Sequence, residues 1–234
     1  MTEDTKLQFL AQLENAISAL EAKLPQTAPY VRPFICDGDV TECNVFIVGT
    51  NPRENMPFRP FWDGRHFDKR DWERHYLWKR YAGGLWPCPA GTRYPTRVSR
   101  VRKKLDVFCR AAAPCRVLEV NIYPIATRTE AELESHSEYK ETAIFDLLWE
   151  ALRPRFVLLH GRAVRTHREP FIKVPVRTNM GAAGVSLKEY AVWTGSPTTA
   201  VAALDRHLGR AGNMAQLIEL GKNISDFFEI SQRL

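Results

Sequence analysis

Polar side chains follow two strand-like runs of this sequence, at the points where the runs end. The apolar run over residues 45–48 is closed by Gly49-Thr50-Asn51-Pro52, and the run Val117-Leu118-Glu119-Val120 is closed by Asn121-Ile122-Tyr123-Pro124. Short apolar runs bounded by Gly and Pro are typical of buried strands that end in turns. Since open α/β sheets bind ligands outside the carboxyl ends of their strands, Asn51 and Asn121 are candidate site residues. The alternative is an ordinary turn, because Asn-Pro is a common turn pair.

The chemistry open to these side chains is the positioning of a water molecule and the binding of a polar edge. An amide takes up no proton at neutral pH, but the carbonyl oxygen of Asn51 could hold a water. Asn121 offers both a donor and an acceptor. Glu119 precedes it by two residues and so faces the same side of a strand. It could supply a carboxylate, as could Glu54; the alternative for Glu119 is a salt bridge with a sheet neighbour or with Arg116.

Two more runs have the same form, Phe156 to Leu159 before His160 and Tyr190 to Trp193 before Thr194. Amphipathic segments lie between the four runs, and strands that alternate with helices indicate a largely parallel sheet covered on both faces. The sequence therefore predicts an α/β fold, a three-layer α/β/α sandwich with a central, mostly parallel four-stranded sheet. The site loops are expected along one edge of that sheet.

Helical spacing of apolar residues predicts the elements around the sheet. A helix is expected over Thr5–Leu24, with Pro25 just beyond its end, and a second over about Lys69–Tyr81. Thr96 is the expected N-cap of a basic helix that runs to about Ala112. Further helices are expected within residues 130–152, from Thr199 to Leu208, and over the tail from Met214 to Leu234.

Composition sets outer limits on the class of protein. The chain has 234 residues, 44% of them hydrophobic and 26% charged, which are the values of a globular protein. We expect one domain over residues 1–234, with an N-terminal helix and connector over 1–30 and a helical tail over 210–234. The sequence has no apolar run of transmembrane length, and its acidic start lacks the apolar core of a signal peptide. A cytoplasmic, monomeric protein without membrane contact is therefore expected.

Positive charge is concentrated in two stretches of a chain with a net charge of +6. Residues 93–104 carry six cations and no acid, and residues 160–177 carry five cations against Glu169 alone. Clustered Lys and Arg are the electrostatic footprint of phosphate binding, which points to nucleic acid as a partner. The alternative is a solvated helix face.

Cysteine usage argues against disulfides and metals. The five cysteines are Cys36, Cys43, Cys88, Cys109 and Cys115. An odd number without a Cys-x-x-Cys pair does not fit a disulfide framework, a zinc site or an iron-sulfur cluster. Free, mostly buried thiols and no cofactor are expected.

The order and content of the four strand ends resemble the uracil-DNA glycosylase superfamily over roughly residues 40–205. Gly49-Thr50-Asn51-Pro52 is similar to the motif that positions the hydrolytic water, and Asn121 to the residue that reads the edge of the flipped base. Leu152-Arg153-Pro154-Arg155 with the strand after it is similar to the third motif, and Ser196-Pro197 to half of the loop that holds DNA. The resemblance implies a uracil-DNA glycosylase-like fold and excision of a base from DNA.

The resemblance also implies roles for other residues. Phe61, or else Phe58 or Trp62, would stack on the extruded base. Ser196, Pro197 and Thr198 would grip phosphate near the extruded nucleotide, and Arg97, Arg100, Lys103 and Lys104 would contact further phosphates. For Ser196 and Thr198 a helix N-cap is the alternative, and both roles can coexist.

Three positions depart from the superfamily pattern. Thr194 stands where the loop histidine is expected, Gly195 follows it in place of proline, and Arg53 follows Pro52. Thr194 can donate only a neutral hydrogen bond to the departing base. Either catalysis on uracil is slow, or another donor, such as Arg53 at the pocket entrance, replaces the histidine. Smaller or neutral residues at 194 and 195 favour a roomier pocket than uracil requires.

The sequence therefore predicts a monofunctional, metal-free DNA glycosylase. It would hydrolyse the N-glycosidic bond of a flipped-out modified or damaged pyrimidine and leave an abasic site. The setting would be base-excision repair, or defence against phages whose DNA carries bulky modified bases. One alternative, which the missing histidine favours, is a catalytically inactive nucleic-acid-binding protein of the same fold. Another is an unrelated α/β enzyme that cleaves free nucleosides.

Overall fold

The structure is a computed structural model of the whole chain. It describes residues 1–24, 30–52, 55–82, 99–127, 129–136, 139–160, 174–181, 185–192, 199–204 and 214–232.

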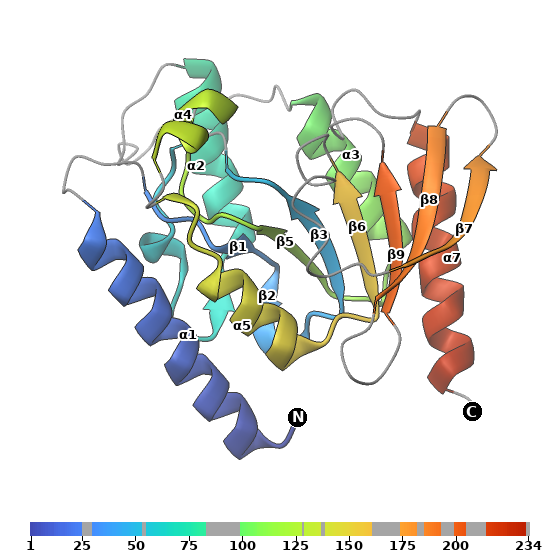
Figure 1. Cartoon of the computed structure of the whole chain (residues 1–234), viewed down its shortest axis with the longest axis horizontal. Coiled ribbons are helices and arrows are strands. Elements are labelled where there is room, and N and C mark those ends of the chain that lie inside the picture. The colour runs from blue at the N-terminus through green and yellow to red at the C-terminus, as the bar shows by residue number, and fades with distance from the viewer. Residues whose placement is uncertain are drawn as a thin grey trace.

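One mixed sheet of seven strands forms the centre of the described structure (Figure 1). In spatial order its strands are β1 (Phe34–Ile35), β5 (Val117–Asn121), β3 (Val45–Gly49), β6 (Phe156–His160), β9 (Thr199–Leu204), β8 (Val185–Val192) and β7 (Val174–Gly181). The four middle strands β5, β3, β6 and β9 are parallel, whereas β1, β8 and β7 join antiparallel. A small second sheet pairs β2 (Gly38–Asp39) with β4 (His66–Phe67). The α/β class and a parallel centre of four strands are thus confirmed, inside a sheet larger than predicted.

The fourth parallel strand is a different segment from the predicted one. The run that ends near Trp193 belongs to β8, which is antiparallel, and Thr199–Leu204, predicted to open a helix, is the parallel strand β9. The sequence of β9, Thr-Ala-Val-Ala-Ala-Leu, is short and rich in alanine, and periodicity cannot separate a strand from a helix in such a run. Pairing with β6 on one side and β8 on the other overrides the helix preference of alanine.

Helices cover both faces of the sheet, which gives three layers. On one face, α1 (Glu3–Lys23) and α5 (Ala143–Leu152) pack on the side chains of Phe46, Val48 and Leu118. On the other face, α3 (Arg100–Ala111) and α7 (Met214–Gln232) pack on Val45, Ile47 and Leu158. Alternation along β3 places its successive side chains in the two separate cores.

Most helix predictions hold, and their boundaries shift. The helix α2 (Lys69–Ala82) lies where it was predicted, and α1 begins two residues earlier than expected, after the N-cap Thr2. The basic helix α3 begins at Arg100, because the hydroxyl of Ser99 accepts a hydrogen bond from the backbone N–H of Arg102. Thr96, the predicted N-cap, lies outside the described residues. Residues 130–152 contain a short helix α4 (Glu130–Ser135) as well as α5.

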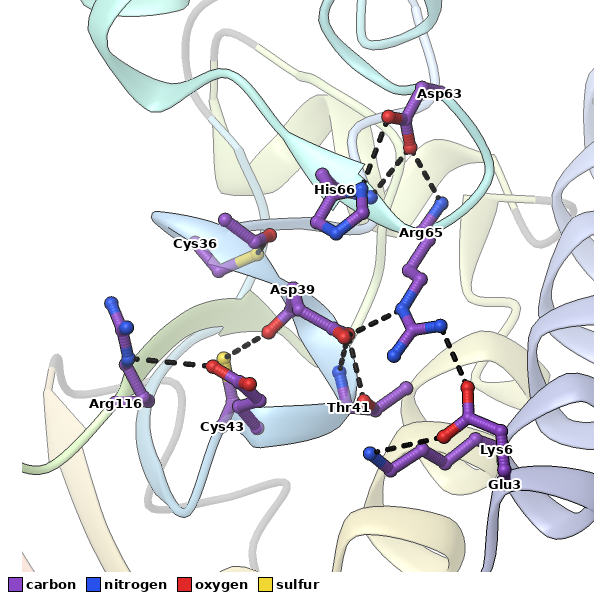
Figure 2. A network of polar contacts seen from close by, with 12 residues as sticks. Glu3, Lys6, Cys36, Asp39, Thr41, Cys43, Asp63, Arg65, His66 and Arg116 are labelled. Atoms are coloured by element: carbon purple, nitrogen blue, oxygen red, sulfur yellow. Dashed lines mark hydrogen bonds and ion pairs between the residues drawn. The ribbon is translucent and has the colours of Figure 1, made fainter.

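A polar network ties the small sheet to the N-terminal helix (Figure 2). The guanidinium of Arg65 lies 2.7 Å from Asp39 Oδ2 and 2.8 Å from Glu3 Oε1. Asp39 also accepts from the N–H and hydroxyl of Thr41, at 2.8 Å each. Nearby, the thiol of Cys43 donates to the carbonyl of Asp39. These contacts fix the segment from which β3 begins.

The thiols in the described part of the chain are free. Cys36, Cys43 and Cys115 are buried and Cys109 is half-buried. Cys88 lies outside the described residues. In that same part of the chain, His, Cys, Asp and Glu side chains nowhere gather in a group of three that could hold a metal ion. The helices described here are also too short or too polar to cross a membrane.

Candidate functional site

A cavity of about 180 Å³ lies where β5, β3 and β6 end. Asn51, Asn121 and His160, at or just beyond those strand ends, line it, together with side chains from α2, from the start of α3 and from Arg32. Along the chain, the parallel strands come in the order β3, β5, β6 and β9. The connection from β3 leads to β5 on one side of it, and the connection from β5 then crosses to β6 on the other side, so the strand order reverses at β3. Such a switch point is where open α/β sheets bind ligands.

The side chain of Asn51 is held in place through the nitrogen of its amide. Its Nδ2 donates to the hydroxyl of Thr127 at 2.6 Å and to the carbonyl of Pro52 at 3.3 Å. The hydroxyl of Thr127 donates its only proton to the carbonyl of Thr129, 3.0 Å away. Its oxygen can therefore only accept a hydrogen bond from Asn51, and the donor of that bond must be the NH₂ group of the amide. This chemistry fixes the orientation of the amide. The Oδ1 of Asn51 has no hydrogen-bond partner among the described residues and remains available as an acceptor.

Gly49 leaves the space that the amide of Asn121 occupies. The two residues pair across β3 and β5. A Cβ atom on residue 49 would lie 2.8 Å from Asn121 Oδ1 and 3.5 Å from the ring of His160. Real Cβ atoms do not approach other atoms as closely as 2.8 Å, so only glycine lets these two side chains stand beside β3 as they do.

Glu119 lines the cavity and pairs with two cations. Its side chain is 10% exposed, with Oε2 2.6 Å from Arg102 Nη2 and Oε1 3.4 Å from Lys69 Nζ. Burial alone would raise the pKa of Glu119, but Arg102, Lys69 and Arg32 together lower it to about 2. A carboxylate with so low a pKa is a weak proton acceptor. The environment of Glu119 therefore favours anchoring Arg102 over acting as a general base. Arg116, its predicted alternative partner, pairs instead with Glu42.

A tryptophan and two arginines form another wall. Trp72, on α2, is fully buried, and the guanidinium groups of Arg32 and Arg102 lie 5.4 Å and 5.6 Å from its ring centre. Cation–π contacts of this kind hold a guanidinium in place without neutralising it. Arg102 has Glu119 as an ion-pair partner, whereas Arg32 forms no ion pair with any described residue.

Three predicted site residues meet in this cavity. Asn51, Glu119 and Asn121 all line it, and Glu119 and Asn121 share one face of β5. The roles predicted for them stay predictions.

Phe58 and Phe61 do not reach the cavity, contrary to the prediction. They are 1% and 5% exposed, and Phe58 packs edge-on against Phe34 at 5.0 Å between ring centres. Trp62, the third candidate, is also buried in that cluster. A ring enclosed by other rings offers no open face for a base. The aromatic side chain that lines the cavity in their place is Trp72, with Tyr76 one helical turn later.

Several predicted residues lie outside the described part of the chain, namely Arg53, Arg97, Thr194, Ser196, Pro197 and Thr198. The described residues on either side of the last four are Val192 and Thr199, which pair with each other. Thr199 lies at the edge where the parallel strands begin, opposite the edge that carries Asn51.

The predicted phosphate-binding cations differ in exposure. Arg100 and Lys103 are exposed on α3, close to the residues of that helix that line the cavity, and Lys104 is half-buried. Arg102, in the same basic run, turns inward to Glu119. Because an α-helix repeats every three to four residues, the apolar spacing in this helix could have shown that Arg102 faces inward while Arg100 and Lys103 face outward. Arg32 carried no signal, because nothing in its local sequence distinguishes it from a surface arginine.

Comparison with known proteins does not assign the chain. No family model matches it, and no curated protein matches it either. The function is therefore argued from the cavity alone.

Proposed function

We propose that the protein is a DNA glycosylase that hydrolyses the N-glycosidic bond of an extruded, modified or damaged pyrimidine. One observation carries the proposal. Asn51, with an available acceptor oxygen, and Asn121 line one cavity at the switch point of a parallel sheet. The fold proposed with it is the uracil-DNA glycosylase-like sandwich, with DNA as the partner.

The geometry supports a division of labour between the two amides. Asn51 Oδ1 would accept a hydrogen bond from the attacking water, and the cationic sugar carbon lowers the demand for a strong base. Asn121 would read the edge of the base, since its amide both donates and accepts. The cavity, about 180 Å³, is smaller than the pockets of about 300–1,000 Å³ that enclose drug-sized ligands. It suits a single base better than a whole nucleotide.

The test is excision from oligonucleotides that each carry one modified pyrimidine. The protein should convert at least one of them to an abasic site, which alkaline cleavage reveals, and Asn51→Ala should not. Absence of abasic sites across the panel, with DNA binding intact, would instead favour the second candidate, a binding protein without catalysis. The low pKa of Glu119 favours that candidate, because the described cavity then holds no carboxylate suited to accept a proton.

Exposed cations on α3 should make DNA binding depend on salt. Arg100 and Lys103 form no ion pair with a described residue, so each is free to neutralise a phosphate. Each contact on duplex DNA contributes about −0.9 to the slope of log K against log salt concentration. Replacing both by glutamine should flatten the slope by about two units on unmodified duplex, without sequence preference.

Arg110→Gln is the matched control for this titration. Arg110 lies on the last turn of the same helix and pairs with Asp106 at 2.8 Å. Its loss should leave the slope within about half a unit of the wild type, because a cation already paired releases few counterions. A wild-type slope near zero would remove DNA as the partner.

A further inference from the structure

Positive charge exceeds negative charge around Glu119, which is buried in the cavity wall. Arg32 is buried and Arg102 largely so, and both line the cavity, whereas Lys69 pairs with Glu119 without lining it. Glu73 adds a second, more exposed carboxylate, with Oε1 4.0 Å from Arg102 Nη1 and a weaker interaction with Lys69. Arg102 and Lys69 use both oxygens of Glu119, so Arg32 interacts with that carboxylate only at longer range and has no ion-pair partner within 4 Å among the described residues.

Arg32 is held by its backbone, and within the described part of the chain its guanidinium Nε has no hydrogen-bond partner. Its backbone N–H donates to the carbonyl of Pro124 at 2.7 Å, and its side chain is 8% exposed. Its Nε is fully buried and has no hydrogen-bond partner among the described residues, and neither has Arg102 Nη1. Both side chains line the cavity. Burial, and then repulsion by Arg102, lower the pKa of Arg32 to about 10, so it stays charged at neutral pH.

A buried charge without a partner is costly, and proteins rarely keep one unless a ligand completes it. The start of α3 adds to the positive potential. Ser99 and Val101 at that end of the helix line the cavity, and the first turn carries cations and no acid, although a helix N-terminus favours acids. Arginine presents a planar fork of N–H groups that matches an oxyanion.

We propose that Arg32, together with Arg102, binds an anionic oxygen group of the ligand in this cavity. This assignment rests on the proposed function, in which that oxygen belongs to the extruded pyrimidine. The oxygen is either part of the base anion that departs or part of an acidic substituent on the base. Arg32 then supplies the charged donor that Thr194 cannot supply. It acts on the base by direct contact, and no bond to Arg32 forms or breaks.

The first experiment needs no glycosylase activity. Inorganic phosphate serves as the probe and is titrated into the full-length protein, with binding followed by calorimetry and by the melting temperature. Phosphate should bind the wild type, and Arg32→Met should weaken binding at least tenfold, the loss expected for a charged hydrogen bond. Arg32→Lys keeps the charge without the fork and should weaken binding less. Arg110→Met, which removes an exposed cation, should leave binding unchanged.

The melting temperature without phosphate separates a ligand site from a structural role. Arg32→Met keeps an apolar side chain on Trp72 and removes an unpaired buried charge, so it should melt about 2–4 °C higher than the wild type. If it melts lower, or binds phosphate as the wild type does, Arg32 is a packing residue and the proposal is wrong. A wild type that binds no phosphate at all would also overturn it.

The second experiment distinguishes the two sources of the oxygen. Single-turnover excision by Arg32→Met is compared on a neutral pyrimidine and on one with an acidic substituent. Loss on both bases assigns the oxygen to the departing base anion, and loss on the acidic base alone assigns it to the substituent. Equal excision by the variant and the wild type on every base would contradict the proposal. A wild type that excises nothing ends the proposed function, and the phosphate titration still decides the anion site.

Discussion

Glu119→Gln should lower the free energy of unfolding by about 3–5 kcal/mol at neutral pH, as breaking a buried ion pair from one side does. The variant keeps the shape of the side chain and removes the carboxylate that pairs most closely with Arg102 and that also pairs with Lys69. Arg102 and Lys69, whose side chains are 13% and 19% exposed, would then face each other, and Arg32, with only the weaker contacts of Glu73 to offset them. Urea denaturation followed by circular dichroism measures the change.

Glu42→Gln is the control for this measurement. Glu42 pairs with Arg116 at 3.6 Å, but about half of each side chain is exposed. Exposed pairs contribute about 0–1 kcal/mol, so this variant should stay close to the wild type. A similarly small decrease in the free energy of unfolding in both variants would contradict the view that the charge of Glu119 stabilises the cavity wall.

The same ion pair makes stability depend on pH. The pKa of Glu119 is about 2 in the folded protein, against 4.5 for a free glutamate. Its contribution to stability is therefore complete above about pH 4.5 and is lost as the pH falls towards 2. Because Glu119→Gln does not titrate, the gap in stability between variant and wild type should narrow through this window.

Asn51→Ala should lower single-turnover base excision by about 10² or more while DNA affinity stays within about twofold. The reason is that Oδ1 is the acceptor left available once Thr127 has fixed the amide. Alanine removes the group that would hold the water and leaves the cationic surface of α3 untouched. The measurement is abasic-site formation with enzyme in excess, on a base that the wild type excises.

Asn44→Ala provides the matched control, because Asn44 lies just before the other end of β3. Its Oδ1 accepts from the backbone N–H of Arg116 at 3.1 Å, far along the strand from the cavity. Excision should be unchanged in this variant. Unchanged excision in Asn51→Ala as well would remove Asn51 from the mechanism and leave its hydrogen bond to Thr127 as a purely structural feature.

The part of the site that could be predicted from the sequence is the part that follows from local pattern. Apolar runs closed by Gly and Pro mark strand ends, and parallel strands bring their carboxyl ends to one edge. That was enough to bring Asn51, Asn121 and Glu119 together. The helices on both faces follow from the spacing of apolar residues in the same way.

The rest depends on contacts between distant segments. Arg32, Trp72 and Arg102 come from three separate parts of the chain, and only the packed structure shows that they meet. Phe58 and Phe61 were expected at the site because aromatic residues suit both a core and a base pocket, and composition does not decide between them. The six residues of β9 suit a helix as well as a strand, and pairing with β6 and β8 makes them a strand.

The parallel pairing of β3 also governs when the cavity can form. Val45 pairs with Val117 on one side and with Phe156 on the other, so both neighbours arrive from far along the chain. Contacts of such high sequence separation form late and slowly, since long loops must close first. A chain still being synthesised, or one cut before residue 156, would expose one apolar edge of β3 and invite aggregation. The smallest fragment able to carry the cavity must therefore extend through β6.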